Sequence, residues 1–136
     1  MIGGLIVTHG RLAIELLNAA EQIIGEVHNV AAVSLGWHDD ADTATGSIAK
    51  AIERVRTPEG VLILTDMFGG TPTNVASTYL DPGKVEIITG VNLPMLIKFV
   101  QLGDGHTLAS AARLIRENGQ SSIYIASELL SPKKQA

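Results

Sequence analysis

The chain has 136 residues, no cysteine and a formal net charge of −4 at pH 7, and 46% of its residues are hydrophobic. This length suits one domain with a core of its own. The absence of cysteine excludes disulfides, thiol catalysis and cysteine-ligated zinc, and the mildly acidic balance argues against a nucleic-acid partner. We expect a single domain over residues 1–130 and a polar tail over 131–136. Without a signal peptide or a membrane-length apolar run, the expected location is cytoplasmic.

Apolar runs and helical spacing alternate along the chain. The runs predict strands over residues 3–9, 30–36, 60–66, 84–90 and 121–129. Spacing of three and four residues predicts helices over 11–25, 40–55, 71–80, 93–103 and 107–119. The expected apolar stripes are Leu12, Leu16, Ala19, Ala20 and Ile23 in the first helix, and Ile48, Ala51, Ile52 and Val55 in the second. Either Asp42 or Thr43 is expected to cap the second helix, and Ser121 and Ser122 suggest that the last strand lies at an edge.

This alternation predicts an α/β fold, a doubly wound parallel sheet with helices on both faces. The carboxyl ends of parallel strands meet at one edge, where such folds bind ligands. Two titratable side chains fall at predicted strand ends, His9 in VTHG and Asp66 in TDMFGGTPTN. We therefore expect His9 and Asp66 to lie close together.

The loop after Asp66 has the composition of an anion site. Gly69 and Gly70 let the backbone turn sharply, and Thr71-Pro72 opens a helix whose first N–H groups have no partner within the helix. Such helix starts bind phosphate. We expect Gly69, Gly70 and Thr71, helped by the backbone of Gly10 and Arg11, to bind a phosphoryl group.

A histidine and a carboxylate beside an anion site suit phosphoryl transfer. A carboxylate that accepts the N–H of one ring nitrogen leaves the other nitrogen nucleophilic. Phosphoryl transfer itself needs mainly positioning and donors for the phosphoryl oxygens. Taken singly, His9 could be structural, Asp66 a turn former and GGTP an ordinary helix start; their coincidence favours function.

Other polar clusters are less informative. GWHDDAD places His38 near Asp39, Asp40 and Asp42, but the spacing matches no calcium or zinc pattern, and we expect no metal. Trp37 either lines the crevice or covers a subunit contact. Asn92 and Pro94 either wall the site or build a strand-to-helix turn.

Three motifs in register, VTHG, TDMFGGTPTN and GVNLPML, resemble the mannose-type enzyme IIA domain of the bacterial phosphoenolpyruvate-dependent sugar phosphotransferase system. The resemblance implies that His9 is phosphorylated on Nε2 and that Asp66 holds the other ring nitrogen. Thr71 stands where many members have serine, and Phe68 where some have tryptophan.

The resemblance also implies partners and an assembly. Phosphate would arrive from the phosphocarrier protein HPr and leave to a separate IIB component, so that the protein is a phosphotransferase without a cofactor. It would reach the membrane only indirectly, through the IIC/IID permease. The implied fold has four parallel strands and an antiparallel edge strand, here 121–129, which can be exchanged between the subunits of a homodimer.

Three alternatives remain. A regulatory IIA protein, whose histidine phosphorylation controls a partner, would have the same local chemistry. A receiver domain phosphorylated on Asp66 would need acidic magnesium ligands at the end of the first strand, where this chain has Thr8-His9-Gly10. A nucleotide-binding module would need GxxxxGK[ST] or GxGxxG, and both are absent.

Overall fold

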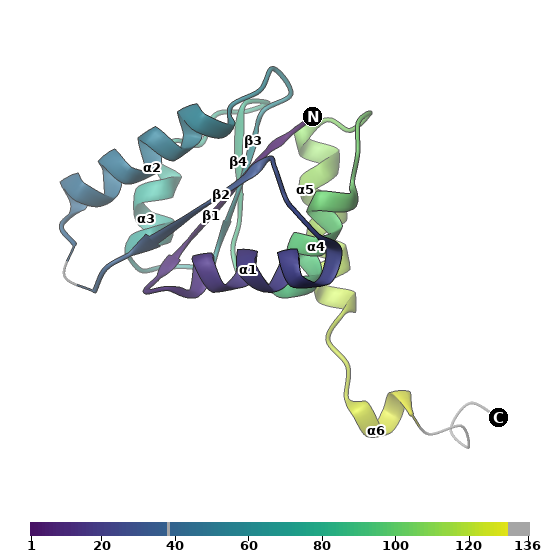
Figure 1. Ribbon diagram of the computed structural model, residues 1–136. Helices are drawn as coiled ribbons and strands as arrows, with labels where there is room; N and C mark the ends of the chain where they lie inside the picture. Colours follow the sequence, from purple (N-terminus) through teal and green to yellow (C-terminus); the bar gives the residue numbers. More distant parts are fainter. Residues whose placement is uncertain (38, 131–136) are drawn as a thin grey trace.

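Strands and helices alternate along the chain as far as the fourth strand in the computed structural model, which describes residues 1–37 and 39–130 (Figure 1). The strands are β1 (Gly3–His9), β2 (Val30–Leu35), β3 (Val61–Thr65) and β4 (Val85–Ile88). The helices are α1 (Leu12–Ile24), α2 (Ala41–Val55), α3 (Thr71–Ser77), α4 (Leu93–Gln101), α5 (Leu108–Ser121) and α6 (Ala126–Leu129). The predicted α/β class is confirmed.

The sheet has four strands in the order β2-β1-β3-β4, and all of its pairings are parallel. Leu5 of β1 lies beside Ala31 of β2 on one side and Ile63 of β3 on the other. The chain moves outward from β1 to β2 and then returns to the other side of β1. The strand order therefore reverses between β1 and β3, and the carboxyl ends of these two strands flank the crevice where such sheets bind ligands.

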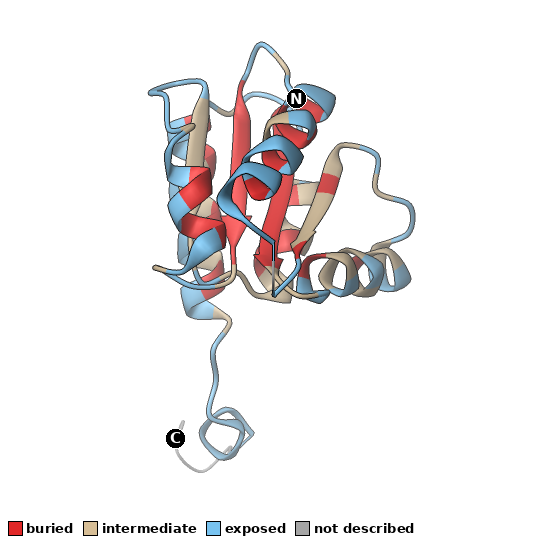
Figure 2. Ribbon diagram, turned by 90° about the vertical axis from the view of Figure 1, so that its left-hand side faces the viewer, coloured by how far each residue is buried: buried red, intermediate tan, exposed pale blue. Residues whose placement is uncertain are grey.

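Helices cover both faces of the sheet: α2 and α3 lie on one, and α1, α4 and α5 on the other (Figure 1). Figure 2 shows β1 and β3 as the buried centre of the molecule. Gly3 and Gly4 permit close packing on opposite faces, because a Cβ would lie 1.9 Å from the Val55 carbonyl oxygen at the first and 2.5 Å from the Phe99 ring at the second. Burial on both faces explains the continuous apolar runs in these strands.

The predicted apolar stripe of α2 is confirmed, because its four members are all buried. The stripe predicted for α1 is wrong at its ends, where Leu12 is 46% and Ile23 61% exposed. Ala13 and Ala20 are the buried residues of α1, so its contact face is rotated relative to the prediction.

The ends of several elements also differ from the prediction. Asp40, and not Asp42 or Thr43, caps α2, because its Oδ1 accepts the N–H of Thr43 at 2.7 Å. Helix α3 stops at Ser77 and α4 at Gln101, both earlier than expected, whereas α5 continues to Ser121. Strand β4 is shorter at both ends.

The predicted strand over 121–129 is wrong for the single chain. Ser121 is the last residue of α5, residues 122–125 form no regular element, and α6 follows. This segment extends away from the body, as Figures 1 and 2 show. Ile123, Tyr124 and Ile125 are 77%, 63% and 64% exposed, so the apolar run finds no partner within the described chain. The expected tail over 131–136 lies outside the described residues.

Over residues 1–37 and 39–130, no helix has the length and apolarity required to cross a bilayer.

Candidate active site at the carboxyl edge of the sheet

His9 is the last residue of β1, and the turn that follows fixes its place. The buried Thr8 hydroxyl accepts the N–H of Ala13 at 2.7 Å and so satisfies a free donor at the start of α1. The N–H of Gly10 donates to the Leu35 carbonyl at 2.8 Å, and Gly10 has a φ of 55°. Because Gly10 adopts this positive φ and is hydrogen-bonded to β2, the chain turns directly from β1 into α1. The side chain of His9 remains 27% exposed.

Asp66 follows β3 and holds His9 at two points. Its Oδ2 lies 2.8 Å from His9 Nδ1 and accepts the backbone N–H of His9 at 3.0 Å. Its Oδ1 accepts the N–H of Met67 at 3.0 Å. An ionised carboxylate only accepts hydrogen bonds, so Nδ1 carries the ring proton and the lone pair lies on Nε2. No described side chain or backbone group hydrogen-bonds to Nε2.

The electrostatics favour an ionised Asp66. Burial raises the pKa of this carboxyl group, since its side chain is only 13% exposed. The hydrogen bonds from the backbone and the ring of His9 act in the opposite direction and, with the electrostatic attraction between the carboxylate and that ring, prevail. The pKa of Asp66 is therefore below its ordinary value, and the carboxylate is available to balance positive charge on the imidazole.

Gly70 lies against the Nε2 side of the ring. A Cβ at this position would lie 3.1 Å from His9 Cε1 and 3.2 Å from Nε2, which is closer than such contacts normally are. Gly70 also has a φ of 84° as the residue before α3. Because Gly70 has no side chain, there is space beside Nε2, and the backbone of the loop lies close to this nitrogen. Thr71 opens α3 and is exposed.

Trp37 covers the ring of His9. The two rings are stacked with their centroids 5.5 Å apart and an interplanar angle of 21°. The loop that carries Trp37 is closed by Asp39, whose Oδ2 accepts the N–H of Gly36 at 2.8 Å. Trp37 therefore lies at the same edge of the sheet as His9.

A pair of buried threonines holds the loop between β3 and α3. Thr73 of α3 is 4% exposed, and its hydroxyl lies 2.9 Å from that of Thr65 at the end of β3 and donates to the Met67 carbonyl. Thr8, Thr65 and Thr73 were not among the site residues predicted from the sequence. A signal was present, since hydroxyl residues at the end of buried strands need partners, but the sequence does not identify those partners.

The Arg11 guanidinium lies 3.9 Å from Glu15 on α1, and Arg11 is the residue before that helix, in the turn after His9. Asn92 and Pro94 have the structural one of their two possible roles. Asn92 builds the strand-to-helix turn, because it caps α4 through the N–H of Met95 at 3.0 Å and donates to the Gly119 carbonyl at 3.2 Å. Pro94 lies in the first turn of the same helix.

Two of the aspartates after β2, which the sequence placed in a possible metal pattern, accept hydrogen bonds from backbone N–H groups. Asp39 and Asp40 accept the N–H groups of Gly36 and Thr43, respectively. His38, the fourth member of the metal pattern, lies outside the described residues. In the described ranges no group of three or more ligating side chains is close enough to share a metal ion.

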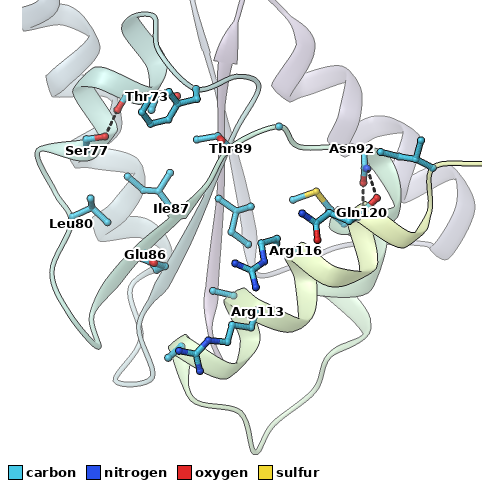
Figure 3. A pocket seen from close by; sticks show the side chains of 18 residues that line it. Thr73, Ser77, Leu80, Glu86, Ile87, Thr89, Asn92, Arg113, Arg116 and Gln120 are labelled. Carbon is cyan, nitrogen blue, oxygen red and sulfur yellow. Dashed lines mark hydrogen bonds between the residues drawn. The ribbon is translucent and has the colours of Figure 1, made fainter.

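A separate groove of about 710 Å³ lies along β4, between α3 and α5 (Figure 3). Its lining includes Ile87 and Thr89 from the edge of the sheet and Arg113 and Arg116 from α5. The groove does not include His9 or Asp66.

The fold and the site together define an α/β protein with a carboxylate-oriented histidine beside a glycine loop at the carboxyl edge of its sheet. Residues 3–115 match the family model described as the PTS system fructose IIA component. The chain therefore belongs to the family of IIA components of the sugar phosphotransferase system, the family that its motifs resemble.

Individual relatives agree with this assignment. The chain is 30% identical over 137 residues to the fructose-specific EIIA component of Bacillus subtilis, covering all of this chain and 94% of that protein. It is 37% identical over 98 residues to the mannose-specific EIIAB component of Escherichia coli K12, covering 71% of this chain and 30% of that longer protein. A crystal structure of EIIA from Streptococcus agalactiae superimposes with a TM-score of 0.84 at 23% identity, covering 94% of this chain and 99% of the other, and shows the shared fold.

Proposed function

We propose that the protein is a phosphocarrier that accepts a phosphoryl group on Nε2 of His9 and passes it to a second protein. The observation that carries this proposal is the 2.8 Å contact between His9 Nδ1 and Asp66 Oδ2, with Nε2 free beside Gly70. The carboxylate fixes the tautomer, so the lone pair that attacks phosphorus is always on the open side of the ring. It also stabilises the positive charge that the ring gains when the new bond forms.

The loop of Gly69, Gly70 and Thr71 supplies donors to the phosphoryl oxygens. Gly70 brings this backbone to Nε2, and the start of α3 adds unpaired N–H groups. On the β1 side, the backbone of Gly10 and Arg11 enters α1 next to the histidine. Phosphoryl transfer needs little beyond such positioning and charge neutralisation.

The donor is HPr and the acceptor a IIB component, as the family membership implies. Both partners would reach His9 across Trp37, Met67 and Phe68, which are 76%, 55% and 83% exposed. Exposed apolar side chains around a reactive group suit repeated docking of protein partners. Association with the membrane would be indirect, through the IIC/IID permease that the IIB component serves.

The protein also forms a homodimer in this proposal, by exchange of the segment after α5. The Lys84 carbonyl accepts the N–H of Val61 and so faces β3. Because successive residues of a strand direct their backbone groups to opposite sides, Ile87 of β4 and Thr89 just after it direct theirs away from β3, toward the free edge of the sheet. An extended strand placed there would fill the groove between α3 and α5. The exposed apolar run 123–125 of a second copy offers such a strand, and the negative charge of its Glu128 is opposite to that of Arg113 and Arg116 in the groove.

The experiment is phosphorylation with labelled phosphoenolpyruvate, enzyme I and HPr, followed by mapping of the label. We expect one acid-labile, base-stable phosphohistidine at His9 and none in His9→Ala. The exposed His28 provides the control, because His28→Ala keeps the reactive histidine and should be labelled like the wild type. Label on Asp66, which would be lost in base, or on a histidine other than His9 would contradict the proposal.

A further inference from the structure

We propose that Trp37 is a positioning residue that stabilises the phosphorylated, positively charged form of His9; this inference rests on the proposed function. The stack at 5.5 Å and 21° joins two residues from separate strand ends, β1 and the loop after β2. Asp66 holds the ring of His9 at its edge, through Nδ1. Trp37 holds it by its face, so the two contacts constrain different motions of the same ring.

Trp37 packs against the turn after His9, and an acidic residue holds its loop. A Cβ at Gly10 would lie 3.6 Å from the indole, an ordinary van der Waals contact, so the indole lies beside the turn after His9. Asp39 closes the loop behind it through the N–H of Gly36, and the N–H of Asp39 donates to the Gly36 carbonyl at 3.2 Å. A side chain that is 76% exposed contributes little to the core. Its position over the ring is therefore better explained by the histidine than by folding.

The chemistry of transfer explains what the indole adds. The lone pair of Nε2 forms a bond to phosphorus while the bond between phosphorus and HPr breaks, and the electrons of that bond stay on HPr. The proton on Nδ1 stays on His9, so the product ring is positively charged next to a dianionic phosphoryl group. An aromatic face attracts a cation more than a neutral ring, and tryptophan does so best. Trp37 should thus favour the phosphorylated state over the free state.

The test measures the equilibrium distribution of label between HPr and this protein. Trp37→Ala and Trp37→Leu should each shift the distribution toward HPr by about two- to fivefold, the effect expected for an exposed cation–π contact. Trp37→Phe should restore most of the wild-type value because it keeps an aromatic face. Ile23→Ala is the control: this side chain is also an exposed apolar group, 61% exposed, but lies near the far end of α1.

A second measurement uses the unphosphorylated protein. The ring protons of His9 lie in the ring current of the stacked indole, so their NMR shifts should change in Trp37→Ala and Trp37→Leu and not in Ile23→Ala. An unchanged distribution in Trp37→Ala, or a wild-type distribution in Trp37→Leu, overturns the inference while the proposed function stands. A wild-type protein that takes no label overturns both.

Discussion

A single oxygen of Asp66 contacts His9 twice, at 2.8 Å from the ring Nδ1 and 3.0 Å from the backbone N–H. The backbone contact ties the carboxylate to the end of β1, and the ring contact orients the imidazole from the end of β3. Because β1 and β3 are neighbours in a parallel sheet, their carboxyl ends are rigidly aligned. The sheet itself therefore sets the distance between the two groups.

Replacing the carboxylate by an amide tests its charge. In Asp66→Asn an oxygen remains to accept the backbone N–H, but the negative charge that favours a positively charged ring is lost. We expect the rate of phosphoryl transfer to fall on the order of 10²-fold, as measured by single-turnover transfer from phosphorylated HPr. Asp104→Asn is the control, since Asp104 is 83% exposed and pairs with the N-terminal ammonium group. Equal rates for Asp66→Asn and the wild type would remove Asp66 from the mechanism.

The lowered pKa of Asp66 predicts how stability depends on pH. The folded protein keeps this carboxylate ionised to a lower pH than the unfolded chain does. Its contribution is therefore fully present above the ordinary aspartate value of about 3.9 and is lost as the pH falls through that value and below it. Urea unfolding of the wild type and Asp66→Asn between pH 3 and 6 measures this effect. The free energies of unfolding should converge as the pH falls, and a constant difference would show that Asp66 has no shifted pKa.

The sequence predicted the fold and the pairing of His9 with Asp66 because both follow from strand order. Buried strands have continuous apolar runs, and parallel strands place their carboxyl ends at one edge. Neither step needs side-chain detail. The contact of Trp37 with His9 was not predictable in this way, because the path of the loop after β2 depends on hydrogen bonds of Asp39 that the spacing does not determine.

The error at the C-terminus has a different physical cause. The segment 121–129 has the apolar, β-branched composition of a strand, but a strand forms only where an edge is available to pair with it. In the single chain the helical periodicity of α5 continues to Ser121, and the following apolar residues remain exposed. Local sequence can indicate that a segment favours pairing but cannot supply the partner.

Gly70 and Gly69 form a matched pair for testing the space beside Nε2. Both have positive φ, 84° and 85°, so alanine is strained at either position, and at Gly70, whose ψ is 169°, the cost is on the order of 1–3 kcal/mol. Only at Gly70 does the new Cβ crowd His9, whereas at Gly69 nothing lies within 4 Å. We expect both variants to unfold at a lower temperature, and a much larger loss of labelling per folded molecule in Gly70→Ala. Equal labelling of the two variants would contradict the assignment of this space to the phosphoryl group.

The exchange of the C-terminal segment can be tested with a second matched pair. Ile125 in the segment and Ile23 on α1 are 64% and 61% exposed in the single chain. Aspartate at either position should therefore leave the fold of one chain intact. If residues 123–125 pack into the groove of a second copy, Ile125→Asp buries a charge there, at a high cost in free energy. Light scattering with size-exclusion chromatography should then show a monomer for Ile125→Asp and a dimer for Ile23→Asp and the wild type. A dimer that persists in Ile125→Asp, or a monomeric wild type, would contradict the exchange.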